Sequence, residues 1–307
     1  MKHNIAVIDF GTNTFHLIIY EVEDSKIQQV LYQKSLPVKL KDGGWKLGEI
    51  SKEAFLRADL AVQAHINVLK DYEVSSLKAI GTEGLRIANN SADFLNHIKD
   101  KYQLEIEIIS GQQEATYIYN GVMKYHQIEG NVLIMDIGGG SVEFIVADKN
   151  EIFWKKSIPI GASYLKSKFH LGDKITSQEQ DQLVKFLLIE LTEVFKVAKY
   201  YAIDTLVGTS GSFETIYDCL NYRKGQRYDD LWKLYKINVN AYNLLHHKFI
   251  DSTMEQRLLI DGMTEFRADM MVVSSILIQT IISQLKFNNI LLARTAIKEG
   301  VAFEMLH

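Results

Sequence analysis

The sequence predicts an α/β fold with two domains. Segments with strand-like and helix-like patterns alternate along the chain, which is typical of the α/β class. A second observation is a repeat, in which an aliphatic run ends in an aspartate and a turn of small residues leads into another aliphatic run. The chain has 307 residues, 47% of them hydrophobic, which is near the size at which one core divides into two. We therefore expect two domains.

The two copies of the repeat span residues 5–20 and 132–147, and their alignment places Asp9 on Asp136 and Gly11 on Gly138. Largely β-branched flanks around a turn of small residues predict two buried strands joined as a hairpin. An aspartate at the strand end can hold a cation, and the turn offers backbone N–H groups to phosphate oxygens. Either copy alone fits an ordinary tight hairpin. Two copies with the same flanks favour a clamp for a phosphorylated ligand and its metal.

Strands are predicted wherever aliphatic or alternating segments lie between turn residues. They cover residues 4–9, 15–22, 27–34, 76–82, 105–109, 132–136, 142–148, 151–157, 204–208 and 289–293.

Helices are predicted from their start signals. Ser51 precedes a helix with apolar residues at helical spacing, and Ser110 with Gln113 forms a capping box that opens another. Thr176 with Glu179 opens a longer helix, whose apolar stripe runs from residue 183 to residue 201. The stripe could bind a partner, but packing on the protein's own core explains it better.

Further stretches carry residues suited to anion chemistry. Residues 79–86 predict a strand that runs into a helix start, where N–H groups favour an anion and Arg86 lies in the first turn. Residues 109–114 place Glu114 in the first turn of a helix, and residues 206–214 form a third turn of small residues. Residues 265–269 are expected to begin a long apolar helix, and residues 296–300 lie in the last one. Each stretch alone also fits a surface charge or a common turn.

Composition excludes several classes of partner and site. The net charge of −4 gives no overall basic surface, so we expect neither DNA nor an anionic membrane as a partner. The single cysteine, Cys219, rules out an internal disulfide and fits a reducing compartment. No apolar run approaches the roughly 18 residues of a membrane span, and no signal peptide is recognisable. We expect a cytoplasmic protein with its domain boundary near residues 120–130.

Together these motifs resemble the exopolyphosphatase and guanosine pentaphosphate phosphatase family, within the actin, hexokinase and Hsp70 superfamily. The motifs that carry the resemblance span nearly the whole chain. They are Asp9-x-Gly-Thr-Asn, Thr82-x-x-x-Arg86, Ser110-Gly-x-x-Glu114, Asp136-x-Gly-Gly-Gly-Ser-x-Glu143, Gly208-Thr-Ser-Gly, Arg267-x-Asp and Lys298-Glu-Gly300.

The resemblance implies a short, two-domain form of the actin-like, ribonuclease H-like ATPase fold with an interdomain cleft. The first domain would cover residues 1–124 and be completed by a C-terminal helix at 294–307, and the second would cover residues 125–293. Lys39, the Ser274-Ser275 pair and Lys298 depart from the family pattern, in which an arginine, glycines and an arginine are usual.

The resemblance also implies the roles of individual residues. Glu114 matches the general base that activates water, and Arg86 matches a second catalytic group that also binds phosphate. Asp9, Asp136 and Glu143 match the metal-associated carboxylates. The positions that match phosphate-binding residues are Gly11, Thr12, Asn13, Arg86, Gly138, Gly139, Gly140, Ser141, Gly208, Ser210 and Gly211.

The function implied is that of an exophosphatase that depends on Mg²⁺, with Mn²⁺ as a substitute, and releases orthophosphate. The substrates would be inorganic polyphosphate, the stringent-response nucleotide pppGpp, or both, and the family often forms homodimers. Hydrolysis of a terminal phosphoanhydride requires mainly that the negative charge of the phosphates be stabilised, and these residue types can do so. One alternative is a kinase or ATPase of the same superfamily. A second is a protein that binds polyphosphate or the nucleotide without turnover.

Overall fold

The computed structural model describes residues 1–43, 48–169, 171–222 and 231–307. The chain forms two compact units. Unit 1 comprises Met1–Gly121 and Ile297–His307, and unit 2 comprises Val122–Ala296. Both units contain strands and helices in alternation, so the predicted α/β class is confirmed. Among the described residues, no helix has the length and apolar character needed to cross a membrane.

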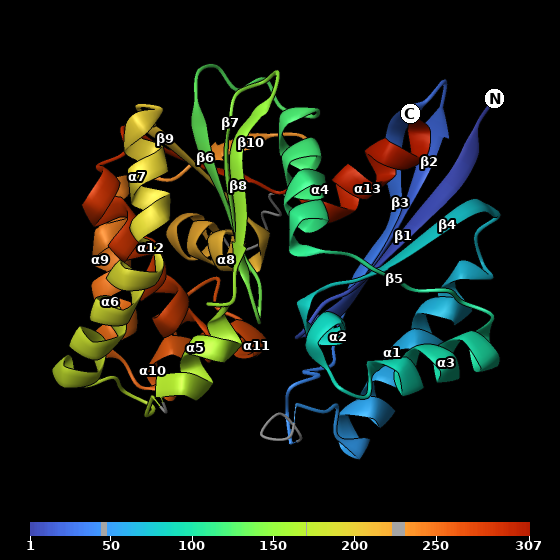
Figure 1. Cartoon of the computed structure of the whole chain (residues 1–307), viewed down its shortest axis with the longest axis horizontal. Helices are drawn as coiled ribbons and strands as arrows, with labels where there is room; N and C mark the ends of the chain where they lie inside the picture. The colour runs from blue at the N-terminus through green and yellow to red at the C-terminus, as the bar shows by residue number, and fades with distance from the viewer. Residues whose placement is uncertain (44–47, 170, 223–230) are drawn as a thin grey trace. The chain divides into compact units, whose positions relative to one another are not determined.

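Unit 1 is a five-stranded sheet with helices on both faces (Figure 1), in the order β3-β2-β1-β4-β5. The pairs β1–β2 and β2–β3 are antiparallel, and β1–β4 and β4–β5 are parallel. Its strands are β1 His3–Phe10, β2 Thr14–Glu23, β3 Lys26–Pro37, β4 Val74–Gly81 and β5 Glu107–Ile108. Its helices are α1 Lys52–Leu69, α2 Glu83–Ile87, α3 Ser91–Tyr102, α4 Gly111–Met123, which extends two residues past the boundary, and α13 Ile297–Leu306.

Alternation along β1 and β2 decides which residues enter the main core of unit 1. Ala6, Ile8 and Phe10 point to the face covered by α1 and α3, and they pack there with Phe94. The other face meets α13, where the Tyr20 hydroxyl donates a 2.6 Å hydrogen bond to Oε1 of the fully buried Glu299. Asp9 has the same parity as the residues of this second face, so the predicted site lies away from the α1–α3 core.

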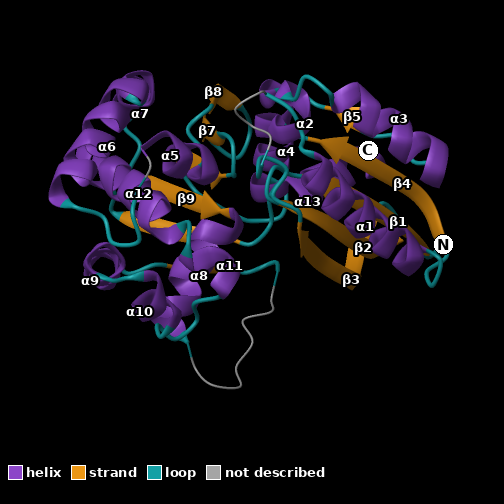
Figure 2. Cartoon of the chain, turned by 90° about the horizontal axis from the view of Figure 1, so that it is seen from below, coloured by secondary structure: helices purple, strands orange, loops and turns teal. Residues whose placement is uncertain are grey.

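Unit 2 is a six-stranded sheet in the order β10-β11-β9-β6-β7-β8. Its strands are β6 Val132–Ile137, β7 Val142–Ala147, β8 Ile152–Ile158, β9 Thr205–Thr209, β10 Leu234–Lys236 and β11 Asn289–Ala293. Its helices are α5 Ala162–Phe169, α6 Ser177–Glu190, α7 Thr192–Tyr200, α8 Ser210–Asn221, α9 Val239–Asp251, α10 Met254–Leu258, α11 Glu265–Ala268 and α12 Met271–Leu285. Figure 2 shows α6 and α7 alongside α12, which is buried along most of its length.

The sequence repeat extends to the topology of the two sheets. Both contain an antiparallel three-stranded meander, β1-β2-β3 or β6-β7-β8, followed in the sheet by two parallel strands. Only the edge strand β10, which pairs antiparallel with β11, has no counterpart among the described strands. The hairpins predicted from the repeat are therefore the first elements of two sheets with the same strand order.

Several predicted elements differ from the observed ones. The long helix from Thr176 breaks at Leu191, because the Thr192 hydroxyl donates to the carbonyls of Leu188 and Ile189 and competes with the helical ladder. The segment 265–269 forms the separate short helix α11 before α12 begins at Met271. Strand β5 has only two residues, and β10 was not predicted, because three residues carry too little periodicity.

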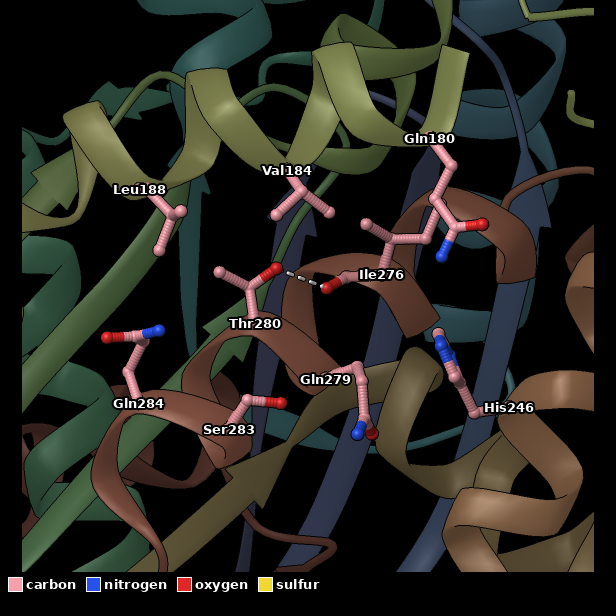
Figure 3. A pocket seen from close by; sticks show the side chains of 9 residues that line it. All are labelled: Gln180, Val184, Leu188, His246, Ile276, Gln279, Thr280, Ser283 and Gln284. Atoms are coloured by element: carbon pink, nitrogen blue, oxygen red, sulfur yellow. Dashed lines mark hydrogen bonds between the residues drawn. The ribbon is translucent and has the colours of Figure 1, made fainter. Parts of the chain in front are cut away.

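A small cavity of about 120 Å³ lies between α6, α9 and α12 in unit 2 (Figure 3). Its lining mixes aliphatic and uncharged polar side chains with the ionisable ring of His246, and none of the predicted site residues lies in it. His246 is buried, with Nδ1 2.5 Å from the Ser275 hydroxyl. Burial, together with a smaller effect of the nearby His247, lowers the pKa of His246 from its ordinary value of 6.5 to about 4.

This histidine predicts a loss of stability in mild acid. Between pH 6.5 and 4 the unfolded chain binds a proton at His246 that the native chain does not, so the free energy of unfolding falls as pH falls. The loss from this group between pH 7 and pH 5 is about 2 kcal/mol. Chemical denaturation at both pH values should show a smaller acid-induced loss for His246→Gln than for the wild type. The matched change at an exposed histidine of unit 1, His3→Gln, should leave the wild-type loss unchanged.

Candidate active site

The first hairpin forms a turn whose carbonyl groups are covered by the segment after β3. Asp9 lies opposite His16 across β1 and β2, and the Gly11 N–H donates to the Thr14 carbonyl at 3.1 Å. The Thr12 carbonyl accepts from the N–H of residue 40 at 2.8 Å, and the Asn13 carbonyl accepts from those of residues 38 and 39 at 2.8 and 2.9 Å. These bonds hold the turn in one conformation.

The second hairpin is built in the same way. Asp136 lies opposite Glu143, and the Gly138 N–H donates to the Ser141 carbonyl at 3.0 Å. Here the start of α5 covers the turn, because the carbonyls of residues 138–140 accept 2.9–3.2 Å hydrogen bonds from the N–H groups of residues 161–164.

Both turns therefore present N–H groups on one side. In a trans peptide the C=O and N–H point in opposite directions, so amides whose carbonyls are covered face away from the covering segment. These are the amides of Asn13 and Thr14 in the first turn and of residues 139–141 in the second. Successive N–H groups on one side of a turn form an anion-binding concavity. The glycine-rich positions predicted to bind phosphate thus lie in two turns of suitable shape, one in each unit.

The two carboxylates of unit 2 are oriented by hydroxyl groups. Asp136 Oδ2 accepts from the hydroxyls of Thr209 and Ser210, both at 2.8 Å. Ser210 has a φ of 63°, a strained value for a residue with a side chain. Glu143 Oε1 accepts from the hydroxyls of Ser141 and Ser157, both at 2.7 Å. Asp136 and Glu143 are 6% and 1% exposed, so both carboxylates lie in a preorganised, nearly buried site.

This donor set fits a magnesium ion with few protein ligands. Within the described ranges, no group of three or more His, Cys, Asp or Glu side chains is arranged to hold a metal. Mg²⁺ commonly binds one or two carboxylates and fills its other positions with waters and substrate phosphate oxygens. The cross-strand pair of Asp136 and Glu143 offers two such oxygen ligands, already oriented by their hydroxyl partners. A closed, all-protein metal cage is not expected here.

Unit 1 brings Glu114 and Arg86 together. The capping box predicted at Ser110 and Gln113 is present, and it starts α4 so that Glu114 lies in the first turn. Arg86 Nη1 donates to Glu114 Oε2 at 3.2 Å and to the Ile109 carbonyl at 2.7 Å. Glu114 is 7% exposed. Arg86 was expected in the first turn of a helix, but α2 has only five residues and Arg86 lies in its last turn.

A buried network behind the first turn was not predicted. Glu83 is 6% exposed and accepts from the Thr12 hydroxyl at 3.0 Å and from Lys41 Nζ at 2.8 Å. It links the turn to the segment after β3, which also covers the turn carbonyls. Lys41 and Glu83 are 42 positions apart, and no local spacing in the sequence signals such a pair. The network fixes the side chain of Thr12, one of the predicted phosphate-binding residues.

The third turn, at residues 208–211, lies against an arginine that was not among the predicted site residues. A Cβ on Gly211 would stand 1.8 Å from Arg267 Nη2, so the guanidinium packs directly on this glycine. Burial lowers the pKa of Arg267, whereas the negative charges of Glu214 and Asp136 raise it. A Cβ on Gly208 would meet the ring of Phe213, so packing accounts for that glycine. The Arg267-x-Asp motif was the available signal for this guanidinium.

These groups have complementary abilities. The two N–H turns and the guanidinium of Arg267 can hold negatively charged oxygens, and the pair of carboxylates in unit 2 can hold a divalent cation. Glu114 can accept a proton, and Arg86 orients it. This combination suits hydrolysis of a phosphorylated substrate.

Comparison of the chain with models of protein families shows where this set of residues belongs. The model of the Ppx/GppA phosphatase family matches residues 18–307. The chain belongs to this family. The resemblance found in the sequence motifs is therefore confirmed over nearly the whole chain, and the residues described above lie in a Ppx/GppA phosphatase.

Solved structures of Ppx/GppA proteins have the same fold. An exopolyphosphatase from Cytophaga hutchinsonii superposes with a TM-score of 0.94 at 33% identity, over 99% of this chain and 98% of that one. A family member from Aquifex aeolicus superposes with a TM-score of 0.83 at 23% identity, over 100% of this chain and 98% of that one. The second likeness shows the fold alone. The predicted actin-like α/β architecture is thus confirmed.

A curated relative carries a different name within the same family. The guanosine-5'-triphosphate,3'-diphosphate pyrophosphatase of Photobacterium profundum is 26% identical over 302 residues, which cover 98% of this chain. The chain spans 59% of the length of that relative. Ppx/GppA relatives of this chain are thus named for either of two phosphoanhydride substrates.

Proposed function

We propose that the protein is an exophosphatase that hydrolyses the terminal phosphoanhydride bond of inorganic polyphosphate, of pppGpp, or of both. The observation that carries this proposal is the nearly buried carboxylate of Glu114, held by Arg86 in the first turn of α4. A fixed carboxylate can orient the attacking water and take its proton, which is one of the parts that such a hydrolysis uses beside the stabilisation of negative charge. The names of the relatives from C. hutchinsonii and P. profundum support the two substrate classes.

In the proposed reaction Glu114 orients the attacking water and accepts its proton. Arg86 donates a hydrogen bond to Oε2 of Glu114 and so fixes the orientation of the whole carboxylate, including Oε1. The N–H groups of the two turns hold the phosphate oxygens, where negative charge must be stabilised during transfer. A Mg²⁺ ion bound by Asp136 and Glu143 would supply charge neutralisation for the phosphate chain.

A phosphate-release assay tests the proposal. The purified protein with Mg²⁺ is given short polyphosphate, long polyphosphate, pppGpp and ATP in parallel, without any acceptor. We expect orthophosphate from polyphosphate, pppGpp or both. Asp136→Asn should lower the rate by about 10²-fold or more, because one of the two proposed magnesium ligands loses its charge. The matched change Asp148→Asn, at an exposed turn after β7, should leave the rate unchanged.

The assay also separates the alternatives. A kinase would consume ATP only when an acceptor is added, and a binding protein would retain polyphosphate or pppGpp without releasing phosphate. No release from any of the four compounds, by a folded protein with Mg²⁺ present, would contradict the proposed function.

A further inference from the structure

The two hairpins match residue by residue in the row of side chains next to the turn, except at one position. In unit 1 the row is Asp9, His16 and Ser35, which are direct cross-strand partners on β1, β2 and β3. In unit 2 the equivalent row is Asp136, Glu143 and Ser157 on β6, β7 and β8. Directly opposite residues lie on the same face of a sheet with close Cβ atoms. Histidine in one row therefore occupies the place of a carboxylate in the other.

The partners of the two central residues are also equivalent. Glu143 takes hydroxyl hydrogen bonds from Ser141 in the turn and from Ser157 on the third strand, both at 2.7 Å. His16 shares a 2.5 Å hydrogen bond with Thr14, which aligns with Ser141, and another of 2.5 Å with Ser35, which aligns with Ser157. One hydroxyl frame thus holds an anion in unit 2 and an imidazole in unit 1.

We infer that His16 excludes the divalent cation from the first hairpin, so that the cation binds only to the row in unit 2. The inference rests on the proposed function, because it concerns the Mg²⁺ ion proposed there. It assigns Asp9 no role as a protein ligand of that ion, contrary to what the sequence resemblance implies.

Two physical arguments support the exclusion. Mg²⁺ prefers oxygen ligands and usually takes them from one or two carboxylates, and the row in unit 1 offers one carboxylate where the row in unit 2 offers two. Both ring nitrogens of His16 are also engaged by hydroxyl groups, at Nε2 by Thr14 and at Nδ1 by Ser35. Binding a metal through the ring would break one of these bonds. In this inference the turn of the first hairpin binds phosphate oxygens of the substrate and no metal ion.

Counting bound Mn²⁺ by electron paramagnetic resonance tests this inference without substrate or turnover. The full-length wild type should bind about one ion per chain, and Glu143→Gln should bind none. His16→Glu should bind about two, because it recreates the Asp–Glu–Ser row inside a hydroxyl frame that already suits a carboxylate. His16→Gln is the matched control, since it keeps a side chain that can bond to both hydroxyls but adds no charge, and it should bind about one.

Two further variants keep the test decisive. Glu143→His gives unit 2 the row of unit 1 and should abolish Mn²⁺ binding. This variant keeps the inference testable if circular dichroism shows that His16→Glu does not fold. Asp9→Asn should keep about one ion. A wild type that binds two ions or none, a folded His16→Glu chain that gains none, or an Asp9→Asn chain that loses its ion overturns the inference. If the stoichiometries hold but no phosphate is released, the proposed function fails and the assignment of the cation stands.

Discussion

Glu114→Gln is expected to lower kcat for phosphate release by about 10²- to 10⁴-fold, the usual contribution of a general base. Glutamine has nearly the same shape and can still accept the hydrogen bond from Arg86 Nη1, but it cannot take a proton from water. KM should change far less than kcat, because the phosphate-holding turns do not contain residue 114. Glu114→Asp withdraws the carboxylate by one methylene, and its kcat should lie between those of Glu114→Gln and the wild type.

Steady-state kinetics with saturating Mg²⁺ measures this effect. Glu105→Gln is a suitable control, because it removes an exposed carboxylate of the same unit, which forms a surface ion pair with Lys99. Thermal unfolding of each variant checks that the fold is intact. A well-folded Glu114→Gln protein with near-wild-type kcat would remove Glu114 from the mechanism.

Gly300→Ala is expected to destabilise unit 1 by about 3 kcal/mol, the upper end of the usual cost of overpacking. A Cβ at this position would stand 1.8 Å from the carbonyl oxygen of Tyr117 and 2.5 Å from its carbonyl carbon. These are backbone atoms of α4, so no side-chain rotation relieves the clash and α13 must move away from α4. The Tyr117 hydroxyl, which donates to Glu304 Oε1 at 2.8 Å, would also lose its alignment.

Thermal unfolding should show a fall in Tm on the order of 10 °C for Gly300→Ala. Gly172→Ala is the matched control, since its new Cβ would meet nothing closer than 3.7 Å. Activity should fall as well, because α4 carries Glu114 in its first turn. A Gly300→Ala chain as stable as the wild type would mean that α13 can shift without cost.

The repeat in the sequence predicted much of the fold and of the candidate site. Asp9 and Asp136 each lie one residue before the end of the first strand of two equivalent hairpins, and the predicted helix starts at Ser51, Ser110 and Thr176 have side chains that cap them locally. Each of these features depends on residues within a few positions of one another. Local spacing is therefore a sufficient guide to them.

The features that were missed depend on tertiary contacts. The sequence indicates neither that the Arg267 guanidinium lies on Gly211 nor that Glu83 joins Thr12 to Lys41, because these partners are brought together only by the fold. The role of the motif Lys298-Glu-Gly300 was not predictable from the sequence either, because tertiary contacts explain two of its residues. Glu299 is buried against Tyr20, and Gly300 allows two helices to approach closely.

The split composition of unit 1 has a consequence for the order of events during synthesis. The ribosome makes β1 through α4, then all of unit 2, and only afterwards the residues of α13. Until that helix emerges, Tyr20 and Tyr117 lack their partners Glu299 and Glu304, and one face of the first sheet lacks the helix that packs on it. The helix that carries Glu114 thus gains its full support last. A nascent chain would acquire hydrolytic competence only after both halves of unit 1 have been made.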